Sequence, residues 1–275
     1  MILNPAQVPD SPLARRNPTV KLAVLFLASV ALLFVLDPVT PAVIYLAGFI
    51  GAAVGGRIPL RTLLAVQLPF FAFAAGVLTI NVLSRPGTAL WEEGPVRLTV
   101  EGLVVGAALA GRTLAIGILS VGFLLTTDSL ALMTSLHQNA RLGARPSYAL
   151  MAGHRLLQQL PGEWAVIRAA QSVRAPLRRA GTVRQGTVRQ GTVRRGPGAF
   201  GRAGFALLVQ SIRRGERMAQ SLESRGLGLT PRTVWRPVHV TSVDLAFGAV
   251  VLAGLATVIG VAGALGLLRG PGALF

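Results

Sequence analysis

Five long apolar stretches, separated by charged or proline-containing connections, constrain this chain more than any other feature of its sequence. A helix needs ~20 apolar residues to cross the hydrocarbon core of a bilayer. Only 13% of the 275 residues are charged, about half the share usual in a soluble domain. The sequence therefore predicts an all-α membrane protein with about five transmembrane helices. The expected spans are residues 20–36, 39–55, 62–83, 99–125 and 243–268.

Arginine and lysine are distributed unevenly among the connections. The N-terminal arm carries Arg15 and Arg16, the second connection carries Arg57 and Arg61, and the first connection has no basic residue. Residues 126–240 hold 18 arginines against four acidic residues, a net charge of +14. Because basic loops stay on the cytoplasmic side, we expect a multi-pass protein of the cell (plasma) membrane with a cytoplasmic N-terminus.

These patterns divide the chain into four regions. Residues 1–19 form a cytoplasmic N-terminal arm that is too polar and proline-rich for a signal peptide. Residues 20–125 form a transmembrane region of four helices, and residues 126–240 form the basic cytoplasmic region. Residues 241–275 form the last transmembrane helix with a short external tail.

Two amphipathic helices are expected in the basic region. Apolar residues recur in steps of three and four over residues 146–174 and again over 205–224, as on one face of a helix. Pro161 is expected to kink or divide the first of these helices. Gly226 is suited to the left-handed conformation that ends the second. Each helix ends in an arginine between small residues: Val173, Arg174 and Ala175, then Ser224, Arg225 and Gly226.

A short repeat lies between the two helices. The sequence Gly-Thr-Val-Arg-Gln occurs twice and is followed by Gly-Thr-Val-Arg-Arg, over residues 181–195. Glycine at every fifth position and repeated positive charge are typical of a solvated, flexible connector.

Several kinds of chemistry have no support in the sequence. The chain lacks cysteine, its three histidines do not pair at metal-ligand spacing, and no nucleotide-binding Gly-Lys loop occurs. A membrane-embedded enzyme would need convergent acids or histidines. We therefore expect a non-catalytic protein without a cofactor or a metal site.

Arg112 stands near the middle of the fourth span. A charge at this depth costs at least ~2.5 kcal/mol, so its side chain should face protein or water. Two interpretations remain open: a structural hydrogen bond to carbonyls of a neighbouring helix, and a contact that orders a transport path. Thr126 and Thr127 end the same span.

The basic region permits three interpretations. Its helices can lie on anionic lipid, bind nucleic acid, or dock on a partner protein. Aromatic side chains for base stacking are nearly absent from the repeat and the second helix, which weakens the nucleic-acid interpretation. An arginine at a helix tip between small residues can enter a groove lined by carboxylates or carbonyls.

The chain resembles the transmembrane T component (EcfT-type) of energy-coupling factor (ECF) transporters, which are uptake systems of the ABC class. Residues 17–22, Asn-Pro-Thr-Val-Lys-Leu, are similar to the entry of the family's first span. Arg112 followed by Thr126-Thr127 is similar to its fourth span. Residues 167–175 and 218–226 resemble the ends of its two coupling helices, and Arg232-Thr233 and Asp244 also match.

The resemblance implies a function and a set of partners. The triplets around Arg174 and Arg225 would each enter a groove of one of two cytoplasmic ATPase subunits, or of an ATPase homodimer. The T component would transmit their ATP-driven motion to a membrane-embedded substrate-binding S component, for uptake of a vitamin or a metal ion such as cobalt. Ala175 and Pro176 depart from the family's usual first triplet. No nucleic acid is implied. The alternative is a membrane-anchored protein whose basic region binds anionic lipid or nucleic acid.

Overall fold

The computed structural model describes residues 10–93, 96–140, 143–174, 197–227, 229 and 237–266. The chain divides into two compact units. The first, here called the membrane unit, comprises Met1–Ala140 and Arg236–Phe275, and the second, here called the α6–α7 unit, comprises Arg141–Trp235. The repeat at residues 181–195 lies outside the described residues, so its conformation and the boundaries of the cytoplasmic region stay predictions.

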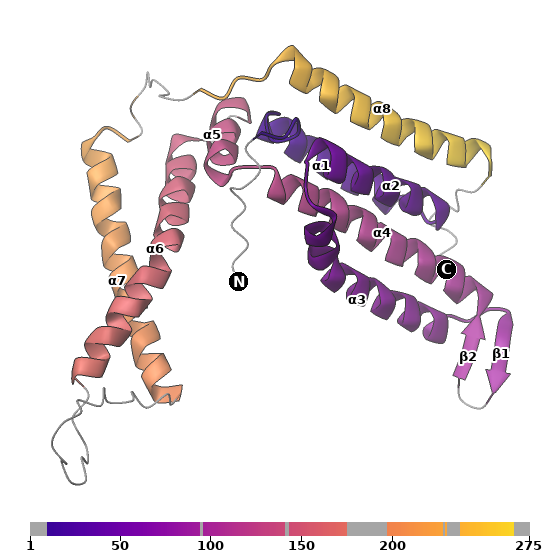
Figure 1. Ribbon diagram of the computed structural model, residues 1–275, viewed down its shortest axis with the longest axis horizontal. Helices are drawn as coiled ribbons and strands as arrows, with labels where there is room; N and C mark the ends of the chain where they lie inside the picture. The colour runs from indigo at the N-terminus through magenta and orange to yellow at the C-terminus, as the bar shows by residue number, and fades with distance from the viewer. Residues whose placement is uncertain are drawn as a thin grey trace, which may run out of the picture. The chain divides into compact units, whose positions relative to one another are not determined.

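The membrane unit contains five apolar helical segments (Figure 1). Three helices are long and apolar enough to cross a membrane, and two further apolar segments are shorter. This confirms the all-α membrane class. The sequence did not predict the two-stranded antiparallel hairpin in the third connection. The elements are α1 (Pro18–Leu33), α2 (Val39–Ile50) with the π-helix η1 (Gly51–Gly55), α3 (Leu60–Ser84), β1 (Ala89–Glu93), β2 (Val96–Thr99), α4 (Val100–Leu125), α5 (Ser129–Asn139) and α8 (Ser242–Ala264).

Polar caps set where the membrane helices begin. Asn17 precedes α1, its side chain accepts a hydrogen bond from the Thr19 N–H, and Pro18 occupies the first helical position. The Thr99 hydroxyl caps α4 in the same way. Thr241 and Asp244 form a capping box at the start of α8. Each cap satisfies backbone donors that would otherwise be unpaired at a helix end.

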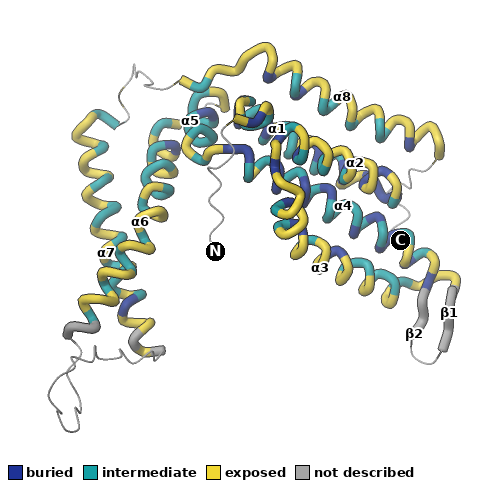
Figure 2. Tube along the Cα trace, in the orientation of Figure 1, coloured by how far each residue is buried: buried dark blue, intermediate teal, exposed yellow. Residues whose placement is uncertain are grey.

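Helix α4 is the centre of the membrane unit. It packs against α1, α2 and α3, and its buried positions are mostly glycine and alanine. Figure 2 shows α4 with more buried positions than α3 or α8. A Cβ atom at Gly117 would lie 2.6 Å from the Phe70 ring of α3. Glycine is therefore required there for close helix packing, as is common in membranes.

The described part of the α6–α7 unit comprises two helices, α6 (Ala144–Arg174) and α7 (Pro197–Ser224), which pack side by side. The Trp164 and Phe200 rings meet edge to face with centroids 5.1 Å apart, and Arg214 pairs with Glu163. Pro161 lies inside α6 and does not divide it. A proline interrupts the backbone bonding of one turn, and α6 continues on both sides of it.

Candidate functional site

The C-terminal end of α7 carries the second predicted arginine triplet. Gly226 has φ +79°, so the expected left-handed conformation is confirmed. The Gly226 N–H donates to the Glu223 carbonyl at 2.9 Å, and the Leu227 N–H donates to the Leu222 carbonyl at 3.0 Å. These two bonds form a Schellman motif. They satisfy two of the last carbonyls of α7 and turn the chain sharply away from the helix axis.

Arg225 is the residue between the last helical position and this turn. Its side chain is exposed, as is that of Ser224, whose hydroxyl donates to the Ser221 carbonyl at 3.0 Å. The turn thus holds an arginine at the tip of a helix where the negative end of the helix dipole is located. Arginine can donate up to five hydrogen bonds in a planar fork, which suits carboxylate or carbonyl acceptors on another surface.

The first predicted triplet lies at the end of α6. Val173 and Arg174 are the last two residues of this helix, and Ala175 lies outside the described residues. The helical placement of Arg174 therefore agrees with a tip position, while its contact with an ATPase stays a prediction.

The side chain of Arg112 makes a hydrogen bond that shows where its positive charge lies in the membrane unit. Its Nη2 donates to the Val35 carbonyl at 2.7 Å, in the turn between α1 and α2. Helix α1 has 16 residues and α4 has 26. Because α1 is shorter than α4, the turn after α1 lies beside the middle of α4 rather than beside its end. This hydrogen bond to a backbone carbonyl is the kind of contact that the structural interpretation of Arg112 predicts. A role in ordering a transport path stays a prediction.

Other buried polar atoms lie in the same turn. Asp37 is 2% exposed and its Oδ2 accepts from the Thr40 N–H at 2.6 Å. Asp37 Oδ1, Thr40 Oγ1 and Arg112 Nε are buried and have no hydrogen-bond partner among the described residues. The turn between α1 and α2 is therefore a polar site inside an apolar helix bundle.

Thr126 and Thr127 are both buried at the end of α4. The Thr126 hydroxyl donates to the Gly122 carbonyl at 2.7 Å, and the Thr126 carbonyl accepts from Lys21 Nζ at 2.9 Å. A cation at the C-terminal end of a helix is favourable because the last carbonyls carry negative partial charge. The lysine of the entry motif to α1 thus caps α4.

A buried network, here called the polar junction, joins α1, α5 and α8. The Asn17 N–H donates to Asp244 Oδ1 at 3.1 Å, and Asn17 Oδ1 accepts from the Ser135 hydroxyl at 2.8 Å. Arg16 lies 3.9 Å from Asp244. Asn139 Nδ2 donates to Ser135 Oγ at 2.9 Å and to the Val238 carbonyl at 3.3 Å.

Sequence reasoning identified Asn17 and Asp244 as matching family positions but did not bring them together. These two residues are 227 positions apart, so no local pattern connects them. Ser135 was not singled out at all, because a serine in an apolar helix has no distinctive spacing. The chain leaves the membrane unit near residue 140 and returns to it near residue 237. Hydrogen bonds at the polar junction connect these two points of the chain.

Several histidines and acidic residues of the described ranges serve other contacts. Within those ranges, no three histidine, cysteine, aspartate or glutamate side chains gather as potential metal ligands. The ring of His154 contacts Gln158, and His239 contributes its backbone carbonyl to Asn17. The polar groups of the membrane unit thus cap helices and join elements.

These features define a polytopic membrane protein that carries a helical unit with an arginine at an exposed tip. Residues 9–235 match the CbiQ family, described as cobalt transport protein, and the chain belongs to this family. The chain is also 28% identical over 245 residues to an energy-coupling factor transporter transmembrane protein, EcfT, of Heliobacterium modesticaldum (strain ATCC 51547 / Ice1). The match covers 86% of this chain and 88% of that protein. The resemblance to the transmembrane component of ECF transporters is thereby confirmed.

Proposed function

We propose that this chain couples ATP hydrolysis in two cytoplasmic ATPase subunits to the movement of a membrane-embedded substrate-capture subunit. The transport complex would take up a vitamin or a metal ion. The chain itself would act mechanically, without a catalytic group, and the capture subunit would determine the substrate.

The observation that carries this proposal is the geometry around Arg225. A Schellman motif ends α7, and the arginine beside it is exposed at the helix tip. A guanidinium held in this way can enter a groove on an ATPase and make charge-assisted hydrogen bonds there. Arg174 at the end of α6 is proposed as the corresponding contact for the second ATPase.

Exposed apolar side chains on α6 and α7 support a second interface. Leu157, Phe205 and Leu208 are 64%, 69% and 56% exposed. Contiguous exposed apolar surface marks interaction sites. Leu208 and Ile212 of the apolar face expected on α7 are thus both more than half exposed. We assign this surface to the capture subunit.

The proposed orientation has the N-terminus in the cytoplasm. Its support is the alternation of basic and neutral connections. Because the chain has no cysteine, single cysteines at Gly87 and Gly270 can be labelled specifically, and both should react from outside the cell. Labelling of Gly270→Cys only after permeabilisation would contradict this topology.

The experiment that tests the coupling proposal replaces Arg225 in the assembled complex. We expect Arg225→Ala to weaken ATPase association by about 2–5 kcal/mol, since acceptors in the groove are left unpaired. Arg225→Lys should restore little, because lysine lacks the planar fork. The measurements are pull-down of the ATPases and uptake of substrate by cells.

Arg213→Ala is the matched control, because Arg213 is exposed on α7 and is not at the tip. It should retain association and uptake. If Arg225→Ala keeps both while Arg213→Ala loses them, the tip assignment is wrong and the polar face of α7 is the docking surface. Material that co-purifies and is sensitive to nuclease would instead favour the nucleic-acid alternative.

A further inference from the structure

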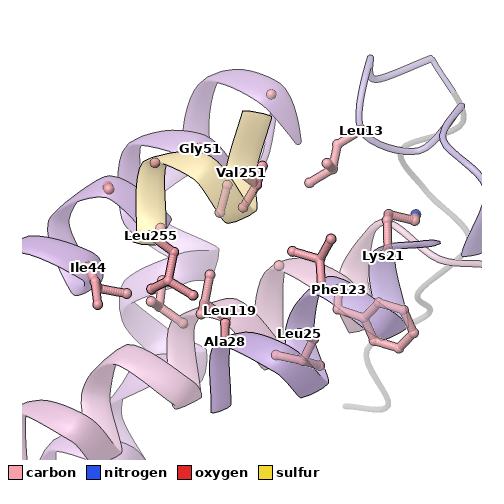
Figure 3. Close-up of a pocket in the computed structure, with 18 of the residues that line it drawn as sticks. Leu13, Lys21, Leu25, Ala28, Ile44, Gly51, Leu119, Phe123, Val251 and Leu255 are labelled. Carbon is pink, nitrogen blue, oxygen red and sulfur yellow. The ribbon is translucent and has the colours of Figure 1, made fainter. Parts of the chain in front are cut away.

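The membrane unit contains an apolar pocket of about 500 Å³ (Figure 3). Its walls come from α1, α2 with η1, α4 and α8, and Leu13 of the N-terminal arm lies at one end. Well-packed interiors leave few voids larger than a water molecule. A cavity of this size between membrane helices therefore has room for a ligand, and its volume is comparable to that of one long acyl chain.

Glycines keep this pocket open. A Cβ atom at Gly51 or at Gly254 would have no atom within 4 Å, in contrast to Gly117, where it would collide with Phe70. Close helix packing therefore does not explain Gly51 and Gly254. Both residues line the pocket, so their missing side chains leave its volume free. Gly51 also begins the π-helix η1, a distortion that is common at functional sites.

A lysine borders one end of the pocket. Figure 3 shows Lys21 and Leu13 near one end, and Ile44 and Leu255 at the other. Lys21 is 5% exposed and donates to the Thr126 carbonyl. An ammonium group has three donors, so a buried lysine with a carbonyl partner retains capacity to bind an anion.

The surface next to this end is also basic. The Leu13 N–H donates to the Gly55 carbonyl at 3.1 Å, which brings the arm with Arg15 and Arg16 to the end of η1. Exposed Arg57 and Arg61 follow η1. With Lys21 these residues supply five positive charges. The nearby carboxylates are Asp10, Asp128 and Asp244, so positive charge remains in excess.

We propose that this pocket binds one acyl chain of an anionic phospholipid, with the lipid phosphate paired to Lys21 and the neighbouring arginines. Water is absent from the hydrocarbon core, so an apolar space there is filled by hydrocarbon. Lys21 lies in the first turn of α1, at the depth where a headgroup phosphate meets the first charged residues. Charge complementarity favours an anionic lipid over a zwitterionic one.

The experiment counts lipids bound to the full chain. Protein purified in mild detergent is mixed with phosphatidylglycerol or with phosphatidylcholine and analysed by native mass spectrometry and by thermal melting. We expect one tightly bound phosphatidylglycerol per chain, and a rise in Tm that phosphatidylcholine does not produce. Gly254→Leu, which fills the pocket, and Lys21→Met, which removes the charge, should each weaken phosphatidylglycerol binding about tenfold or more.

Gly260→Leu is the matched control, since Gly260 is also on α8, a Cβ there meets no atom within 4 Å, and it does not line the pocket. Gly51→Leu serves as a second filling variant if Gly254→Leu fails to fold. The proposal is overturned if the filling variants bind as much phosphatidylglycerol as Gly260→Leu, or if both lipids bind equally. Cross-linking of Gly254→Cys to a co-purified protein subunit would also overturn it, because a partner helix would then occupy the pocket.

Discussion

The membrane unit and the α6–α7 unit are held together in different ways. In the membrane unit, buried hydrogen bonds join residues far apart in sequence, such as Lys21 with Thr126 and Asn17 with Asp244. In the described part of the α6–α7 unit, the interhelical contacts include one aromatic pair and a partly exposed ion pair. The membrane unit is thus held together by buried contacts between distant residues, while many apolar side chains in the described part of the α6–α7 unit stay exposed.

Exposed apolar residues mean different things in the two units. Phe26 and Phe73 of the membrane unit are 66% and 65% exposed, and on apolar membrane helices such residues face lipid tails. Phe205 of α7 is 69% exposed on a helix that also carries Arg213, Arg214 and Arg217. The same degree of exposure is therefore explained by lipid in the membrane unit, whereas in the α6–α7 unit it agrees with the protein partner proposed above.

The largest predicted effect on stability is at the polar junction. Asn17→Ala removes an acceptor used by Thr19 and Ser135 and a donor to the His239 carbonyl. Because buried partners are left unpaired, we expect a loss of about 3 kcal/mol, or roughly 6–12 °C in Tm. Thermal melting of the purified protein measures it. Asn139→Ala should lower Tm much less, because Asn139 is an exposed member of the polar junction. If Asn17→Ala and Asn139→Ala lower Tm equally, burial does not determine how much each member of the junction contributes to stability.

The second prediction separates the two interpretations of Arg112. Arg112→Met leaves the Val35 carbonyl without its donor, and we expect a loss of about 1–3 kcal/mol. Substrate uptake should then fall only in proportion to the amount of folded protein in the membrane. A variant that melts like the wild type but does not support uptake would instead establish a direct role in the transport path.

The smallest predicted effect is in the α6–α7 unit. The side chains of Arg214 and Glu163 are 38% and 24% exposed, and partly exposed ion pairs contribute about 0–1 kcal/mol. In a double-mutant cycle of Arg214→Ala and Glu163→Ala, the interaction energy should stay below about 1 kcal/mol. The measurement is thermal melting of the four proteins. A larger interaction energy would mean that this unit is held more firmly than its contacts suggest.

Local sequence patterns predicted much of the fold. Apolar length located five apolar helical segments, three of which are long enough to cross a membrane, because a helix must satisfy its own backbone in lipid. The glycine after Arg225 predicted how α7 ends, because a left-handed residue has little steric cost only at glycine. The start of α7 was placed at residue 205 instead of Pro197, since the segment before it is rich in glycine and gave no clear helical pattern.

The sequence alone determined the membrane class, the family and the arginines proposed to contact the ATPases, because hydropathy, charge and short motifs are local properties. Tertiary structure decided which polar residues meet. Asn17, Ser135 and Asp244 join three helices, Arg112 reaches the turn after α1, and Gly51 and Gly254 border one pocket. These contacts link residues distant in the chain, and their partners depend on how the helices pack, which no local pattern specifies.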